Sequence, residues 1–178
     1  MHKPTKQSLI ITLIIDDTAQ QFFNEKRLQF YPAYANFVPA HLTLFYNLPV
    51  GNNLVQATLL KMISTVQFQM KVNSLICINN FVAYQIESSD LANIHLDIQF
   101  ALKKFLHYKD LQPLWPHITI QNKGTAYKAF KTHQYLTLQF APFNITALGF
   151  STWLYANKRW AKDEDFLFKN NLKITNCS

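Results

Sequence analysis

The sequence predicts one mixed domain of helices and strands, built from two related lobes. Each half of the chain offers a strand, a helix and a further strand that carries a His-x-Thr motif. The two motif histidines, His41 and His117, lie 76 positions apart. The 178 residues contain no Pro/Ser-rich linker, no low-complexity tract and no abrupt change in composition. We therefore expect a single two-lobed domain over residues 1–178.

In the first half, the β-branched, apolar run 8–15 predicts a buried strand. An Asp-Thr pair can cap a helix over 18–30, in which aromatic residues recur at helical spacing. Two prolines then break the chain before a strand over 41–47. An Asn pair begins a helical stretch over 52–66.

In the second half, residues 88–108 give the clearest helix, because an N-capping serine precedes an apolar stripe with residues every three or four positions. The second His-x-Thr segment predicts another strand, and Thr125 can cap the helix that follows. Further strands are expected over 68–78, 81–87, 144–156 and 159–168, and the last helix over 126–135.

Composition limits the class of protein. The chain is 49% hydrophobic and 15% aromatic, which is enough for a substantial core. It has only three glycines and no glycine-rich phosphate loop, so the common nucleotide-binding loops are excluded. A formal charge of +7 favours anionic partners such as phosphate groups or nucleic acid. The basic residues are dispersed in pairs, so charge alone identifies no partner.

Cysteine usage and the first apolar run bear on location. Cys77 and Cys177 form no C-x-x-C motif, and we expect reduced thiols in a cytoplasmic protein. The run 8–15 is too short to span a membrane and is followed directly by two aspartates. We interpret it as a strand rather than a signal peptide, and expect no membrane association.

The two His-x-Thr segments read HLTLF (41–45) and HITIQNK (117–123). Side chains alternate along a strand, so His41 and Thr43 share one face and the neighbouring leucines share the other. The same rule places His117 and Thr119 together. If the lobes meet with these faces inward, two imidazoles and two hydroxyls converge in one cleft.

That set of groups suits chemistry at a phosphodiester. One histidine can take a proton from the nucleophile and the other can deliver one to the leaving oxygen, because imidazole holds either protonation state near neutrality. The two threonine hydroxyls can donate to the non-bridging oxygens. No carboxylate lies near either motif, so the sequence predicts neither a metal nor another cofactor.

Two alternatives remain. His-x-Thr is common in strands, and a single copy is more often packing than catalysis. The two copies could therefore be structural, or could form a catalytically idle site that binds RNA or a phosphorylated ligand. Two copies in similar apolar frames favour the enzyme, and the other four histidines have no Thr at the same offset.

Secondary candidates surround the motifs. Lys123 could reach a phosphate from the end of its strand. Phe45 is expected on the cleft-facing side of its strand and is the aromatic residue best placed to contact substrate. Tyr46, Trp115 and Trp153 could stack on a base, although packing explains them equally well.

The paired motifs resemble the twin H-x-[TS]-hydrophobic signatures of the 2H phosphoesterase superfamily. That superfamily includes the 2′-5′ RNA ligase-like proteins and the cyclic nucleotide phosphodiesterases of RNA processing. The closing segment STWLYANKRWAKDEDFLF (151–168) is similar to the last strands of the family. The resemblance implies a bilobal, pseudo-two-fold α+β fold, with two antiparallel sheets lining a central cleft and helices packed outside.

The resemblance also implies an activity. A 2′,3′-cyclic phosphate on an RNA end or a nucleotide would be opened to a 2′-phosphate without a metal, or RNA ends would be joined in reverse through a 2′-5′ bond. His41 and His117 would form the acid–base pair, with His117 as base and His41 as acid in hydrolysis. Thr43 and Thr119 would hold the phosphate. We expect a monomer.

Two features depart from the family. Many relatives have a basic residue two positions after the second Thr, where this chain has Gln121. The segment FYNLP (45–49) replaces a glycine-containing turn often found after the first motif. The substrate is therefore open between a mononucleotide, an RNA terminus, a 2′-5′ oligonucleotide and a small metabolite.

Overall fold

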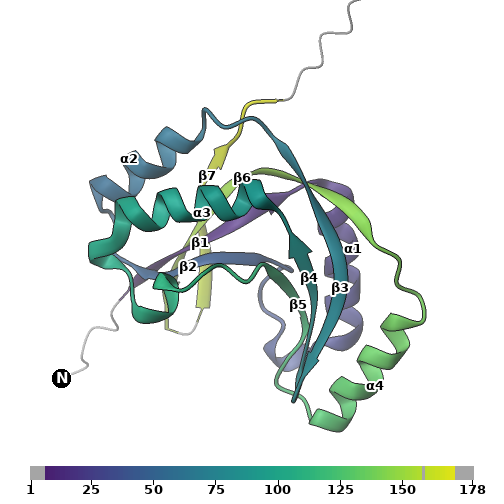
Figure 1. Ribbon diagram of the computed structural model, residues 1–178. Coiled ribbons are helices and arrows are strands. Elements are labelled where there is room, and N and C mark those ends of the chain that lie inside the picture. The colour runs from purple at the N-terminus through teal and green to yellow at the C-terminus, as the bar shows by residue number, and fades with distance from the viewer. Residues whose placement is uncertain (1–6, 158, 171–178) are drawn as a thin grey trace, which may run out of the picture.

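The computed structural model describes residues 7–157 and 159–170 (Figure 1). Across these ranges the chain forms an α+β fold. Its strands are β1 (Ser8–Ile15), β2 (Leu42–Leu48), β3 (Phe68–Ile78), β4 (Phe81–Glu87), β5 (His117–Gln121), β6 (Phe143–Ala156) and β7 (Arg159–Leu167). Its α-helices are α1 (Asp17–Phe30), α2 (Asn53–Met62), α3 (Ser89–Leu102) and α4 (Ala126–Thr137). The predicted free thiol at Cys177 lies outside the described residues.

Most elements follow their sequence signals. The side chains of Asn52, Ser88 and Thr125 accept hydrogen bonds from the first turns of α2, α3 and α4, as capping residues do. Asp16 caps α1, one position earlier than expected. None of the helices in the described ranges is both long and apolar enough to cross a membrane.

The third helix is shorter than predicted. It ends at Leu102 instead of continuing to 108, and two 3₁₀ turns follow, at Lys103–Phe105 and at η3 (Tyr108–Leu111). The chain doubles back along α3 here, because Gln99 Nε2 donates to the carbonyl of Asp110 at 2.8 Å and to that of Gln112 at 3.3 Å. A continuing helix could not make these contacts.

The strands form one sheet, which corrects the expectation of two. Six strands run in the order β2-β1-β6-β3-β4-β5, every pair is antiparallel, and β7 pairs with β6. The reason lies in the length of β6. Its residues 147–155 pair with β1, while residues 143–147 pair with β3 on the other edge. One strand therefore joins the parts that the sequence presents as separate lobes.

The backbones of β6 and β7 approach each other closely at Gly149. Gly149 has φ +156°, and an added Cβ would collide with the carbonyl oxygen of Phe166 on β7. The same Cβ would lie 2.9 Å from the Cα of Leu167. Glycine is the residue that lets the two backbones approach this closely.

The sheet curls so that its two ends meet. β2 and β5 stand at opposite ends of the strand order, and yet they contact each other (Figure 1). Strand twist accumulates across a sheet and makes such curvature possible. These two strands carry the His-x-Thr motifs, so the curl brings the motifs together.

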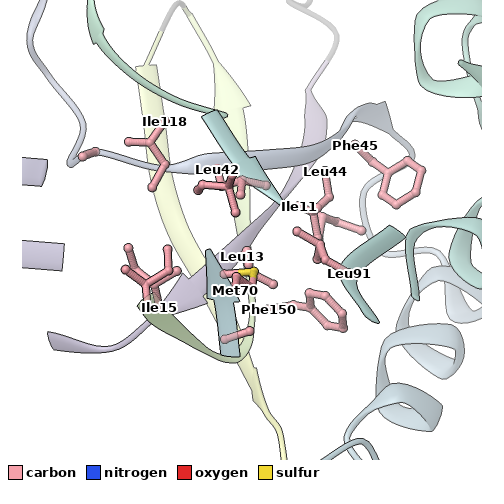
Figure 2. Packing of buried hydrophobic residues seen from close by; sticks show 14 of the residues in the cluster. Ile11, Leu13, Ile15, Leu42, Leu44, Phe45, Met70, Leu91, Ile118 and Phe150 are labelled. Atoms are coloured by element: carbon pink, nitrogen blue, oxygen red, sulfur yellow. The ribbon is translucent and has the colours of Figure 1, made fainter. Parts of the chain in front are cut away.

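Helices cover the sheet in two groups. α2 packs with α3, while α1 contacts β5 and α4 contacts β3 and β4. Phe22 and Phe23 of α1 meet Tyr84 and Phe143 of the sheet with ring centroids 5.2–6.1 Å apart. Leu42 of β2 and Ile118 of β5 lie in one buried cluster (Figure 2), so the two ends of the sheet share a core.

Candidate active site

The motif strands alternate as the sequence predicts. In β2 the leucine after His41 is buried, and in β5 the isoleucine after His117 is fully buried. Thr43 and Thr119, like both histidines, are half-buried on the other face. The aliphatic side chains hold each strand in the core, and the polar side chains are left on the side where the ends of the sheet meet.

Each motif histidine is held by a hydrogen bond of the same kind, from its Nδ1 to the carbonyl oxygen two residues earlier. His41 Nδ1 lies 2.7 Å from the carbonyl oxygen of Pro39, and His117 Nδ1 lies 2.8 Å from that of Trp115. A carbonyl oxygen can only accept, so each Nδ1 carries the proton and donates it. In the neutral ring Nε2 is then an acceptor in both histidines, which is the tautomer required of a general base.

A polar stripe on α1 holds both motif strands. Gln20, Asn24 and Arg27 follow at i, i+4 and i+7, so they lie on one face of the helix. Gln20 Nε2 donates to the carbonyl of Ala40 at 2.8 Å, and Asn24 Oδ1 accepts from the Ala40 amide at 2.8 Å. Arg27 Nη1 donates to the carbonyl of Thr119 at 3.0 Å. One helix therefore sets the position of the residue before His41 and of the second motif threonine.

The motifs border a cleft of about 660 Å³. His41 and Thr119 line it from the two ends of the sheet, and Arg27 lines it from α1. Its remaining lining residues are mostly aromatic or polar: Tyr31, Ala35, Phe37, Val38, Tyr46, Asn122, Tyr155, Asn157, Arg159 and Trp160. The structure thus brings one residue of each motif to the cleft, whereas Thr43 and His117 do not line it. His117 is still near enough for its charge to lower the pKa of His41.

Arg27 is an unusual cation for this position. Only 4% of it is exposed, and no carboxylate in residues 7–157 or 159–170 forms an ion pair with it. Its Nε donates to Asn36 Oδ1 at 2.8 Å, and its guanidinium carbon lies 3.9 Å from the centroid of the Tyr31 ring. Burial lowers its pKa. A buried charge without a counter-ion is costly, so an anion in the cleft would be stabilised here.

The pKa values of both motif histidines are lowered, mainly by burial. Burial lowers the pKa of His41 to about 4, the Pro39 carbonyl opposes that shift, and the charges of Arg27 and His117 add to it. Burial also lowers the pKa of His117, against the effect of its bond to the Trp115 carbonyl. Both rings are therefore neutral at neutral pH in the free protein, and His41 is the harder of the two to protonate.

Phe45 does not face the cleft, which corrects the sequence-based expectation. It is fully buried in the hydrophobic cluster (Figure 2). Its ring stacks on that of His95 of α3, with ring centroids 4.5 Å apart. The pairing of β1 with β2 explains this. Thr43 pairs with Thr12, but Phe45 pairs with Ile11, so a β-bulge inserts one extra residue into β2. The bulge reverses the alternation, and Phe45 turns into the core.

Tyr46 takes the place expected for Phe45. It lines the cleft and is 44% exposed. Tryptophans also flank both motif histidines. The ring of Trp160 lies 5.0 Å from that of His41 at 40°, and Trp115 lies 4.6 Å from His117 at 41°. Trp153 is held differently, because its Nε1 donates to Thr12 Oγ1 at 2.9 Å.

Lys123 and Gln121 flank the end of β5. Lys123 is exposed with φ +66°, and its side chain does not line the cleft. Gln121, where many relatives have a basic residue, is fully buried, and its amide has no hydrogen-bond partner among the described residues. The cations that line the cleft are instead Arg27 and Arg159.

Sequence reasoning missed Arg27 and Trp160. The i, i+4, i+7 spacing of the polar stripe on α1 is a signal that could have identified Arg27. Trp160 left no such signal, because its contact with His41 depends on how β7 crosses the sheet. In the described part of the chain, no three His, Cys, Asp or Glu side chains gather as metal ligands would.

Known structures share the overall fold of this chain. A structure of TT0787 from Thermus thermophilus superposes with a TM-score of 0.62 at 13% identity, over 92% of this chain and 99% of that one. E. coli LigT complexed with ATP gives 0.58 at 14% identity, over 94% and 99%. Kluyveromyces marxianus Usb1 gives 0.50 at 11% identity, over 89% and 98%. At these identities the likeness shows the fold alone.

Among curated proteins, none matches the chain in sequence. A family profile, described as the 2′-5′ RNA ligase superfamily, matches residues 15–156. That range includes α1, both His-x-Thr strands and the joining strand β6. The chain therefore belongs to the 2′-5′ RNA ligase superfamily.

Proposed function

We propose that the protein is a metal-independent phosphodiesterase that opens a 2′,3′-cyclic phosphate, on an RNA end or a nucleotide, to a 2′-phosphate. The observation that carries the proposal is the matched pair of Nδ1–carbonyl hydrogen bonds, which leave Nε2 of both histidines able to accept a proton. His41 and Thr119, one residue from each motif, line the same cleft. Complexes of E. coli LigT with 3′-AMP and with ATP support a nucleotide as the ligand. The same site would catalyse 2′-5′ ligation in reverse.

In hydrolysis, one imidazole accepts a proton from water through Nε2 as the water oxygen attacks phosphorus. The bond from phosphorus to the 3′ oxygen breaks, and the other imidazole, in its protonated form, gives that oxygen a proton. The phosphate stays on the 2′ oxygen. Each proton transfer contributes on the order of 10²–10⁴-fold in rate.

The order of the pKa values favours His41 as the base and His117 as the acid. Burial, together with the charges of Arg27 and His117, lowers the pKa of His41 to about 4, so a single proton shared by the pair is expected on His117. This is the reverse of the assignment expected from the sequence. Thr43, Thr119 and Arg27 hold the non-bridging oxygens, where negative charge increases during attack.

The test replaces each motif histidine by alanine. His41→Ala and His117→Ala are each expected to lower the rate of uridine 2′,3′-cyclic phosphate hydrolysis by about 10²-fold or more. Phosphorus NMR identifies the position of the product phosphate, and EDTA is expected to leave the wild-type rate unchanged. His133→Ala, on α4, is the matched control.

Full activity in either motif variant would rule out the two-histidine mechanism. Tight binding of a 2′-phosphorylated nucleotide without hydrolysis of any cyclic phosphate would identify a binding module on the same fold instead.

A further inference from the structure

A second hollow adjoins the active-site cleft. It has a volume of about 720 Å³ and lies between the end of β2 and η3. Tyr46 lines both the cleft and this hollow, so the two lie next to each other at that residue. The other lining residues are Asn47, His107, Tyr108, Lys109 and Asp110.

The floor of this hollow is held in place by hydrogen bonds. Asp110 is buried, with 7% exposed, and its Oδ1 accepts from the backbone amide of Tyr46 at 3.3 Å. Gln99 of α3 holds the carbonyls of Asp110 and Gln112 from the other side. The turn η3 is therefore tied to both β2 and α3, and the hollow is part of the fold.

The exposed groups of the hollow combine aromatic rings with positive charge. Tyr108 is 77% exposed, Tyr46 is 44% exposed, and Lys109 and His107 stand beside them. The one acidic group, Asp110, is turned inward onto the Tyr46 amide. Rings that can stack on bases, next to a lysine that can pair with a phosphate, are the features by which proteins bind single-stranded nucleic acid.

We propose that this hollow binds the nucleotide that precedes the cyclic phosphate, so that the substrate is a single-stranded RNA end of two or more nucleotides. The base of that nucleotide stacks on Tyr108, and its phosphate lies near Lys109. This inference rests on the proposed function, because it takes the reacting phosphate to sit beside His41. Tyr46 then lies between the two nucleotide positions.

The experiment compares three substrates that end in the same uridine 2′,3′-cyclic phosphate: the mononucleotide, the dinucleotide and the trinucleotide. For the wild-type protein, kcat/KM is expected to rise about tenfold from mononucleotide to dinucleotide, since one stacked base contributes that much or more. Tyr108→Ala should remove this gain and leave mononucleotide turnover unchanged. Lys109→Ala should reduce the gain and flatten its dependence on salt.

Tyr127→Ala is the matched control, because Tyr127 is 71% exposed on α4, which packs on β3 and β4 instead of β2. It should keep the full gain with chain length. Equal kcat/KM for all three wild-type substrates, or an undiminished gain in Tyr108→Ala, would overturn the subsite but not the proposed function.

A binding measurement separates the two proposals if no substrate is hydrolysed. Fluorescence anisotropy with a labelled trinucleotide 3′-phosphate then replaces turnover. Weaker binding by Tyr108→Ala than by Tyr127→Ala would support the subsite while the hydrolase fails. Equal binding by the two variants would overturn the subsite as well.

Discussion

His41 and His117 have closely similar surroundings. Each ring donates from Nδ1 to the carbonyl two residues earlier, and each packs against a tryptophan at a closely similar angle. Burial lowers the pKa of both, and only His41 is also subject to the charges of Arg27 and His117. In the proposed mechanism, burial and these charges together make His41 the base.

The acid and base roles can be separated with a substrate whose leaving atom is sulfur. A thiolate leaves without protonation, so the variant that lacks the acid should recover activity. With a 3′-thio cyclic phosphate, we expect His117→Ala to regain about 10²-fold relative to His41→Ala. Single-turnover rates on the oxygen and sulfur substrates give the ratio. Recovery in His41→Ala instead would restore the assignment expected from the sequence.

Arg27 is expected to bind the substrate phosphate. Arg27→Met should weaken binding of uridine 2′-phosphate about tenfold or more, because a hydrogen bond to a charged group is lost. It should also raise the pKa of His41, since the Arg27 charge lowers that value in the wild type. Isothermal titration and an NMR pH titration measure the two effects.

Lys26→Met serves as the control, because Lys26 lies on the same helix over the Phe22 ring and does not line the cleft. Arg27→Lys keeps the charge and should hold His41 near its wild-type pKa. An unchanged His41 pKa in Arg27→Met would contradict the electrostatic role.

The candidate site was only partly predictable from the sequence, for reasons that differ from residue to residue. The alternation of His41, Thr43, His117 and Thr119 with aliphatic residues is local, so the motif could be read directly. The failure at Phe45 is also local in origin, but a β-bulge leaves no trace in a period-two pattern until the partner strand is known. Arg27 reaches Thr119 across 92 positions, and only the fold reveals that contact.

At the scale of elements, capping and periodicity located the helices and strands well, and β1, β3 and β4 have the predicted bounds. These signals describe a segment by itself. They do not report pairing partners, so the double role of β6 could not be read from an apolar run over 144–156. The sequence of α3 likewise does not show that the helix ends at Leu102. That end depends on a contact with a later segment, in which Gln99 donates to the carbonyl of Asp110.

Gly149 tests the importance of the crossing between β6 and β7. Gly149→Ala is expected to lower the free energy of unfolding by about 3 kcal/mol, as overpacking against rigid backbone does. Gly51→Ala is the control, because Gly51 also has a positive φ of +65° but an added Cβ there meets nothing within 4 Å. Gly51→Ala should lower the free energy of unfolding by about 1 kcal/mol, because only the backbone conformation is strained there.

Urea denaturation of both variants provides the measurement. Equal destabilisation would mean that the approach of Phe166 to β6 does not constrain the strand. A larger loss in Gly149→Ala that leaves mononucleotide turnover intact would place the effect on stability and not on the site.

At the scale of the whole molecule, three histidines with lowered pKa link stability to pH. Burial lowers the pKa of His41, His117 and the core residue His95. An unfolded chain restores values near 6.5, so between that pH and about 4 the unfolded state binds more protons than the folded state. The free energy of unfolding should therefore rise with pH through this window. The part of it that comes from these histidines is lost as pH falls.

Urea midpoints at pH 7.5 and pH 5.0 measure this dependence, and the midpoint should be lower at pH 5.0. His95→Phe keeps a ring to stack on Phe45, but that ring cannot titrate. The urea midpoint of this variant should therefore change less between the two pH values than that of the wild type. A midpoint that does not change with pH in the wild type would show that the histidines are protonated equally in both states.

The central position of β6 has a consequence for how the protein is made. Both histidine strands precede residue 143 in the chain, so they leave the ribosome before β6 does. Until then β1 and β2 can form one ribbon and β3, β4 and β5 another, with no backbone hydrogen bonds between the two. A nascent chain stopped short of residue 143 would hold every proposed catalytic group without the strand that joins the two ribbons, and its unpaired strand edges would need protection by chaperones.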